Sequence, residues 1–299
     1  MQQFLQHPQF AGSWRMLAAM LMSGTIGLFV VESGQDTATV VFYRCLLGGA
    51  ALLAYLSWQR GWQKLSAQQT GYLLVGGLAL VANWFCLFAA YKLSSISVAT
   101  LVYHTQPFFL LLLTALGSRQ WPPAVKWVWL TVAFAGVAGT TGLGEAMHDD
   151  SLWLGVGFAA VAACLYAVAT LTTRQLTGVA PAQIAGLQMV LGVLLMLPLE
   201  KTSLLVMPAL SIGALLTLGL VHTGLMYNLM YSAFQRLPVT SIAFLSFIYP
   251  LLTVLIDFWY YDLTLSLSQY AGMALIVVAL LAHQRDWGSS WPRKAVKTD

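Results

Sequence analysis

The sequence predicts an all-α integral membrane protein with ten transmembrane helices, arranged as two inverted five-helix repeats. Three observations predict this fold. The chain of 299 residues is 59% hydrophobic and only 8% charged, with a mean hydropathy of +0.76, whereas soluble domains carry roughly a quarter charged residues. The apolar residues fall into ten runs, each suited to one helical crossing of a bilayer. The two halves of the chain also share a spacing of aromatic residues and prolines.

The ten apolar segments are separated by short polar links that hold most of the charge. Their predicted bounds are 14–31, 37–58, 70–91, 96–116, 125–143, 152–174, 180–199, 208–232, 239–260 and 267–283. These runs are apolar all round, which favours helices over the alternating strands of a barrel. The predicted organisation is a cytoplasmic segment at 1–13, a first repeat at 14–143, an extracytoplasmic link at 144–151, a second repeat at 152–283 and a basic cytoplasmic tail at 284–299.

The distribution of lysine and arginine predicts the orientation. If the N-terminus is cytoplasmic, eleven of these residues lie inside, two (Lys92 and Lys201) lie outside, and Arg44 remains within a helix. Such a bias follows the positive-inside rule, which the opposite orientation would violate. An even number of crossings then places both termini in the cytoplasm.

A shift of 143 residues aligns the third to fifth segments with the eighth to tenth without a gap. Pro107 then falls on Pro250. Three aromatic residues also match in order, namely Trp84, Phe88 and Tyr91 on Tyr227, Tyr231 and Phe234. Because each half has five crossings, an odd number, the second half must enter the membrane upside down. Inverted repeats of this kind recur in secondary transporters, which hold their substrate between the repeats near the midplane.

Catalytic and cofactor motifs are absent from the sequence. It contains no H-E-x-x-H, Walker A or G-x-S-x-G pattern, so we expect neither an enzyme nor direct use of ATP. The three cysteines, Cys45, Cys86 and Cys164, lie inside apolar segments, where they are typical of small buried side chains rather than a metal site. We therefore expect no cofactor, metal or nucleic acid. The expected partners are a small-molecule substrate and the lipid bilayer.

Two stretches carry a resemblance to a known family. One is AAYKLSSISVATLVYHTQPFFLLLLTALGSRQW (89–121), and the other is SAFQRLPVTSIAFLSFIYPLLTVLIDFWYYDLTLSLSQYAGMALIVVALLA (232–282). Each has an alanine-containing helix end, a short link and a helix with a central proline; in the second, Asp262 and Gly272 follow. With ten helices in two halves, this pattern resembles the EamA type of the drug/metabolite transporter superfamily. The chain departs from that pattern at Arg119, where an acidic residue is common.

The resemblance implies an exporter of small metabolites or drugs in a bacterial inner membrane. We expect a secondary transporter that moves small amphipathic metabolites, such as amino acids, by alternating access around a central cavity. One alternative is a broad-specificity exporter of drugs or quaternary cations, which an acidic residue within the first helix would favour. A passive channel or an intramembrane enzyme is an alternative of another class. The sequence leaves the coupling ion and the oligomeric state open.

Arg44 is the most unusual residue of the apolar segments. A charge within a membrane helix costs about 2.5–3.5 kcal/mol on insertion scales, so Arg44 should face a cavity or a partner. Its guanidinium could bind a substrate carboxylate through two hydrogen bonds. Alternatively, it could pair with Glu32, with Asp36 or with helix-end carbonyls.

Polar residues gather around the proline of the fourth segment. Tyr103, His104, Gln106 and Pro107 lie at its centre, and the second repeat offers a weaker counterpart in Ser246, Tyr249 and Pro250. We expect the first four residues with Ser246 and Tyr249 to line a substrate site near the midplane, and the two prolines to act as hinges, because proline interrupts helical hydrogen bonding. Interhelical hydrogen bonding without a substrate is the alternative.

The matching aromatic residues and their neighbours are further candidates for the cavity wall. Trp84 and Phe88 would face Tyr227 and Tyr231, with two asparagines beside them, Asn83 and Asn228. Such rings could hold planar or cationic groups, or they could simply pack against neighbouring helices.

Proton coupling has two candidates, Asp257 and His104. Asp257 lies near the outer end of the ninth segment, where burial would favour a proton. It also lies next to Trp259, Tyr260 and Tyr261, a cluster typical of the aromatic belt at a membrane interface. His104 could shuttle a proton, or it could donate a hydrogen bond within the helix.

Overall fold

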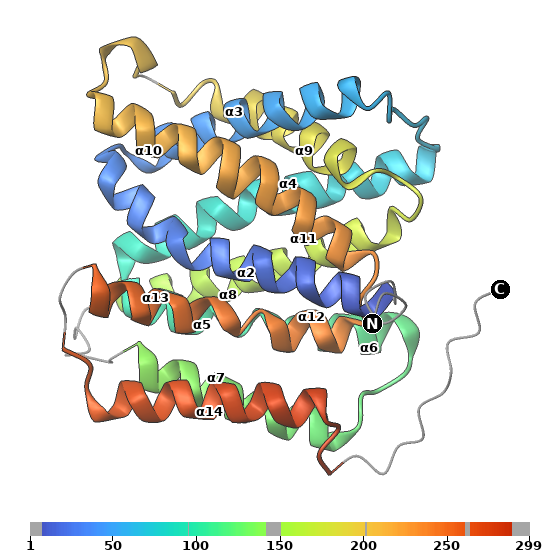
Figure 1. The fold of residues 1–299 in the computed structure, drawn as a ribbon, viewed down its shortest axis with the longest axis vertical. Helices are drawn as coiled ribbons and strands as arrows, with labels where there is room; N and C mark the ends of the chain where they lie inside the picture. Colours follow the sequence, from blue (N-terminus) through green and yellow to red (C-terminus); the bar gives the residue numbers. More distant parts are fainter. Residues whose placement is uncertain (1–7, 95, 142–150, 201, 261–263, 289–299) are drawn as a thin grey trace.

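The computed structural model describes residues 8–94, 96–141, 151–200, 202–260 and 264–288, and all regular elements in these ranges are helical. The helices run roughly parallel and are stacked along the long axis of the molecule (Figure 1). Their bounds are α2 Pro8–Ser33, α3 Thr37–Trp58, α4 Ala67–Leu93, α5 Ile96–Tyr103, α6 Gln106–Ser118, α7 Ala124–Thr140, α8 Ser151–Gln175, α9 Pro181–Met196, η1 Leu204–Val206, α10 Ala209–Gly219, η2 Leu220–Leu225, α11 Met226–Phe234, α12 Val239–Leu245, α13 Ile248–Trp259 and α14 Leu267–Gln284.

The ten predicted crossings are all present. Eight described helical stretches are long and apolar enough to span a membrane, and two shorter apolar helices, α7 and α9, complete the set. Three crossings consist of more than one element: α5 with α6, α10 with η2 and α11, and α12 with α13. The first helix also begins earlier than the sequence indicated, at Pro8 rather than near Trp14. The chain is therefore an integral membrane protein with multiple spans.

The two five-helix halves are inverted relative to each other. The links α3–α4, α6–α7, α8–α9 and α11–α12 lie at one end of the molecule, whereas the links α2–α3 and α9–α10 lie at the other (Figure 1). The first half begins with α2 at the first of these ends, and the second half begins with α8 at the opposite end. The packing repeats this symmetry, because α4 packs against α8 while α10 and α11 pack against α2. The helices α3 and α9 pair with each other, as do α7 and α14.

The positive charges of the described residues gather at one end of the molecule. Four of these residues lie in links, namely Arg60 and Lys64 between α3 and α4, Arg119 after α6 and Arg236 between α11 and α12. The others lie in or next to helix ends at the same end of the molecule: Arg15 in α2, Lys126 in α7, Arg174 in α8 and Arg285 after α14. Lys92 lies at the opposite end, in the last turn of α4. Lys201 and the basic residues of the tail beyond 288 lie outside the described ranges. The Lys and Arg residues that predicted the orientation are thus also gathered in space, at one end of the molecule.

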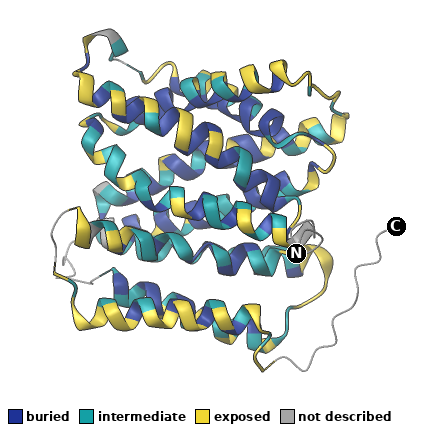
Figure 2. Cartoon of the chain, viewed as in Figure 1, coloured by how far each residue is buried: buried dark blue, intermediate teal, exposed yellow. Residues whose placement is uncertain are grey.

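Burial is concentrated in the middle of the stack. Figure 2 shows many buried residues along α4, α8 and α11, whereas α14 is mostly exposed or partly exposed. On α14 only Gly272, Ile276, Ala279 and Ala282 are buried, and the first two lie against Gly136 of α7. At this interface small residues let the two backbones approach closely, as is common between membrane helices. The central helices therefore carry the residues that can form a site.

Candidate functional site

Arg44 lies in the buried centre of the protein, between three crossings. It is 5% exposed. Its Nε donates to Thr223 Oγ1 of η2 at 3.3 Å, and its guanidinium carbon lies 5.5 Å from the ring centre of Trp84 on α4. Trp84 in turn meets Tyr227 of α11 edge to face, with ring centres 6.4 Å apart. Three of the predicted residues, the cation Arg44 and the aromatic residues Trp84 and Tyr227, thus form one cluster in the structure.

The alternative that Arg44 pairs with Glu32 or Asp36 is not found among the residues that the structure describes. Asp36 caps α3 instead, accepting hydrogen bonds from Ala38 N at 2.8 Å and Thr39 N at 3.2 Å. Glu32 accepts a hydrogen bond from the hydroxyl of Tyr260 at 3.3 Å. The ion pair found among the described residues, Lys126 with Asp286 at 2.7 Å, lies at the basic end of the molecule. Within the described part of the chain, Arg44 therefore has no carboxylate partner.

A π-helical turn places Thr223 against Arg44. Side chains in η2 reach carbonyls five residues earlier, with Thr223 Oγ1 donating to Leu218 O at 2.9 Å. Such turns are rare and often occur at functional sites. Thr223 was missed by the sequence analysis, because its counterpart 143 residues earlier is the apolar Leu80. The only signal in the sequence was a pair of polar residues, His222 and Thr223, inside an apolar run.

His222 holds the same turn against α2. Its Nε2 lies 2.7 Å from Thr25 Oγ1, and its Nδ1 lies 3.2 Å from Thr217 O. The Thr25 hydroxyl also donates to Met22 O at 2.8 Å. His222 therefore has a partner at both ring nitrogens and holds η2 against α2.

Replacing Gly48 with alanine is expected to separate η2 from α3. A Cβ at this position would lie 2.5 Å from Thr223 Cγ2 and 2.7 Å from the carbonyl oxygen of Gly219. Overpacking of this kind costs about 1–3 kcal/mol, so the unfolding midpoint of the purified protein should fall by several degrees. A matched control is Gly213→Ala on α10, where no atom lies within 4 Å of the added Cβ. Equal thermal stability of both variants would contradict this packing.

A pocket of about 290 Å³ borders the Arg44 cluster. It lies between the N-terminal part of α3, the second half of α4 and the end of α9. Two of the predicted aromatic residues, Trp84 and Phe88, line it, and Trp84 also contacts Arg44. The remaining lining residues are Asp36, Thr37, Ala38, Val41, Val81, Phe85, Ala89 and Met196.

Both prolines of the repeat follow breaks in their helices. The first crossing breaks at His104 and Thr105, just before Pro107, and the second breaks at Ser246 and Phe247, just before Pro250. Hydroxyl groups at the breaks compensate for lost backbone bonds: Thr105 Oγ1 donates to Val102 O at 2.6 Å, and Ser246 Oγ donates to Ala243 O at 2.7 Å. The breaks are also in contact across the repeat, because the rings of His104 and Tyr249 lie 4.7 Å apart.

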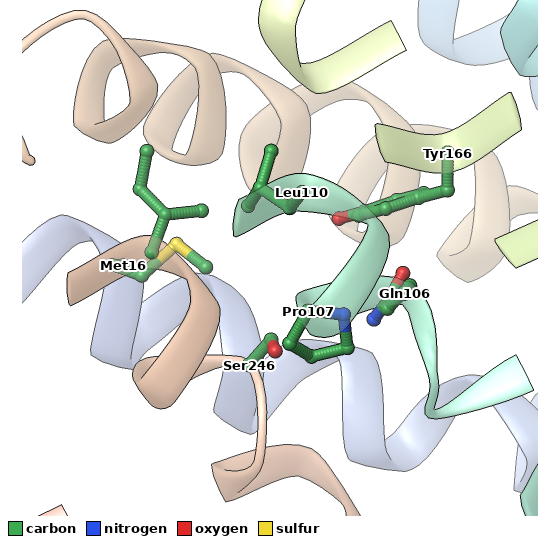
Figure 3. Close-up of a pocket in the computed structure, with 7 residues that line it drawn as sticks. Met16, Gln106, Pro107, Leu110, Tyr166 and Ser246 are labelled. Carbon is green, nitrogen blue, oxygen red and sulfur yellow. The ribbon is translucent and has the colours of Figure 1, made fainter. Parts of the chain in front are cut away.

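The space between the two breaks is nearly filled in this conformation. The pocket there has a volume of about 10 Å³ and is lined by Met16, Gln106, Pro107, Leu110, Tyr166, Ile242 and Ser246 (Figure 3). Such a volume is at the limit for a single water molecule. In this conformation the pocket between the two breaks, with Leu110, Tyr166 and Met16 in its wall, is too small for a metabolite, and the larger pocket lies to one side, at α3 and α4.

Two atoms at the first break lack hydrogen-bond partners among the described residues, Gln106 Oε1 and His104 Nε2. Both side chains are almost completely buried. His104 Nδ1 lies 2.6 Å from Thr100 O, and a carbonyl only accepts, so this nitrogen carries a hydrogen. His104 is therefore a donor within its own helix. Its role in proton coupling stays a prediction.

Other predicted residues have partners within the protein. Asn83 donates to Ala162 O at 2.7 Å and to the hydroxyl of Tyr103 at 3.2 Å, which ties α4 to α8 and α5. Tyr231 donates to Gln188 Oε1 at 2.5 Å. Asn228 lies partly buried on α11, away from the residues that line either pocket. These contacts account for the burial of Asn83, Tyr103 and Tyr231 without a substrate.

Asp257, the other candidate for proton coupling, belongs to α13, but its side chain lies outside the described part of the structure. The neighbouring Trp259 and Tyr260 are 78% and 55% exposed. Their exposure at a helix end is typical of an interfacial aromatic belt. The role of Asp257 in proton coupling stays a prediction.

Comparison with known proteins identifies relatives of the whole chain. The model of the EamA-like transporter family matches residues 10–142 and again residues 153–282. The uncharacterized transporter YxxF of Bacillus subtilis is 28% identical over 88% of this chain and 88% of its own length. An uncharacterized transporter of Archaeoglobus fulgidus is 26% identical over 82% of this chain and 88% of its own length.

Two further comparisons concern part of the chain and the fold. The pseudopaline exporter CntI of Pseudomonas aeruginosa is 34% identical over 39% of this chain and 43% of its own length. A crystal structure with 20% sequence identity superimposes with a TM-score of 0.79, covering 91% of this chain and 98% of the other. At that identity the match shows a common fold.

Proposed function

Because the chain belongs to the EamA-like transporter family, we propose that it is a secondary transporter that exports small amphipathic metabolites, such as amino acids, by alternating access. Family membership covers both halves and makes the protein a membrane transporter rather than an enzyme. The substrate, the direction and the mechanism are the proposal. Export is supported by the similarity to a protein named as an exporter, CntI.

The observation that carries the mechanism is the contact between two broken helices. The breaks before Pro107 and Pro250 occupy matching places in inverted halves, and they pack against each other through His104 and Tyr249. Inverted repeats with discontinuous helices near the midplane are the recurrent architecture of alternating access. Small bends at the two breaks would open the nearly filled centre toward one side and close it toward the other.

The charge distribution supports an orientation with both termini in the cytoplasm of a bacterial inner membrane. The basic end of the molecule, which includes Arg60, Arg119 and Arg236, would face the cytoplasm. The pocket beside Trp84 then lies toward the extracytoplasmic end, since Asp36 and Met196 at the end of α9 line it.

Spin-label distances test the alternating-access proposal. One pair of labels at Gln68 on α4 and Pro238 before α12 reports on the basic end, and a second pair at Leu93 and Leu210 reports on the opposite end. We expect the two distance distributions to change in opposite directions when a transported substrate is added. Two distributions that stay fixed during transport would reject the mechanism.

Uptake into liposomes tests the function itself. The purified protein is reconstituted, and fluxes of amino acids and cationic dyes are measured with and without a pH gradient. We expect saturable flux of a small amphipathic metabolite. Saturable flux of the dyes alone would favour the drug exporter, and flux that rises without saturation would favour a channel.

A further inference from the structure

We propose that Arg44, held in place by Thr223 and Trp84, binds the carboxylate of the substrate next to the inner wall of the 290 Å³ pocket. The proposal rests on the transport function proposed above and narrows its substrates to carboxylates with an apolar body.

The first argument is the balance of charge. Arg44 is buried and within 4.0 Å of no carboxylate among the described residues. A buried charge without a counter-ion is strongly unfavourable. The one hydrogen bond that Arg44 makes to a described residue uses Nε, so both terminal nitrogens remain for a ligand. An anion from solution would supply the missing charge and accept these hydrogen bonds.

The second argument is the position of Arg44 relative to the pocket. Thr37 and Val41 line the pocket, and Arg44 follows Val41 by three residues on the same face of α3. Trp84 lines the pocket on its other side and presents its ring to the guanidinium. Arg44 thus lies directly behind the wall formed by Val41 and Trp84, and a carboxylate that passes Trp84 would meet it, while Trp84 and Phe88 would contact the apolar body of the ligand.

The third argument concerns the class of anion. A planar guanidinium matches the two oxygens of a carboxylate. A phosphate dianion would bring a second charge, and no second cation of the described chain lines the pocket. A cationic ligand would be repelled by Arg44. A volume of about 290 Å³, at the lower end of the range for ligand pockets, also favours a small molecule.

Charge-selective labelling tests the site without knowledge of the substrate. In a background without Cys45, Cys86 and Cys164, Val41→Cys reports from the pocket wall. The reagents are the anionic sulfonatoethyl and the cationic trimethylammonioethyl methanethiosulfonates. We expect the ratio of anionic to cationic reaction rates to fall about tenfold in Arg44→Gln. The exposed cation Lys64 provides the control, because Lys64→Gln should leave the ratio unchanged.

Two outcomes of this experiment would overturn the proposal. One is a ratio of anionic to cationic reaction rates that is the same whether position 44 is Arg or Gln. The other is no reaction of the cysteine at position 41 with either reagent in any background, since an anion from solution would then not reach the pocket.

Protection by a ligand tests the carboxylate directly. Benzoate and benzamide share shape and apolar area, and each is added while the cysteine at position 41 reacts with uncharged N-ethylmaleimide. We expect benzoate to slow the reaction of this cysteine when position 44 is Arg but not when it is Gln. Benzamide should slow the reaction at least about tenfold more weakly. Equal effects of the two compounds, or no effect of benzoate, contradict the site.

The liposome assay separates this proposal from the proposed function. Benzoate protection that depends on Arg44, without any saturable flux, would reject the transport proposal and keep the anion site. Saturable flux of an amino acid that is unchanged in Arg44→Gln and Arg44→Lys would keep the transport proposal and reject the anion site.

Discussion

Gly272→Ala is expected to give the largest loss of stability among single-methyl additions in this protein, because it forces α14 away from α7. The added Cβ would lie 2.5 Å from the carbonyl oxygen of Gly136 and 2.9 Å from the amide nitrogen of Thr140. Both are backbone atoms, which cannot rotate away as a side chain can. The reverse contact is also tight, since a Cβ on Gly136 would lie 2.7 Å from the Gly272 oxygen.

The expected effect is a fall of about 5 °C or more in the unfolding midpoint of the purified protein, corresponding to an overpacking cost of about 1–3 kcal/mol. Gly71→Ala on α4 is the matched control, because no atom lies within 4 Å of its added Cβ. In that helical position alanine should be neutral or stabilise by about 1 kcal/mol. If Gly272→Ala is as stable as Gly71→Ala, the packing of α7 against α14 is wrong.

Replacement of the two repeat prolines is expected to cause the largest loss of transport with the fold retained. Pro107→Ala and Pro250→Ala each restore a backbone amide hydrogen. This hydrogen can bond to the carbonyl four residues earlier, that of Tyr103 or of Ser246. The restored bond would make the broken helix continuous and oppose bending at the break. We expect the exchange rate in liposomes to fall about tenfold or more in each variant.

A measurement of substrate binding to the proline variants shows whether the prolines act as hinges or as binding residues. Because the prolines act through the helix and not through Arg44, ligand-induced stabilisation of the purified variants should change little. Pro208→Ala, in the exposed link before α10, is the control and should transport at the normal rate. Transport at the normal rate in both repeat variants would reject the hinges.

The sequence was sufficient for the membrane architecture because the relevant information is local. Hydropathy averaged over about 20 residues identifies a crossing wherever it occurs, and all ten crossings, including the short α7 and α9, were located in this way. The repeat that matches Pro107 to Pro250, with an odd number of crossings in each half, then led to the inverted halves. The same prolines were predicted as hinges, and the structure has a helix break just before each of them.

Features of the candidate site depended on contacts between distant segments. The sequence singled out Arg44 but left its partner open between a substrate carboxylate, helix-end carbonyls and the acids Glu32 and Asp36. In the structure Asp36 caps α3 and Glu32 binds Tyr260. Thr223 reaches Arg44 only because of the π-helical turn, and no pattern in the sequence indicated that turn.

The sequence by itself determined that this protein crosses the membrane ten times, with two inverted halves and basic links on one side. Only the tertiary structure decided that the centre between the prolines is packed, that the larger pocket lies between α3 and α4, and that Arg44 meets Trp84 and Thr223. The reason is physical. Transfer into lipid is nearly additive over residues within one helix, whereas a pocket or a contact depends on how side chains from several helices fill the same space.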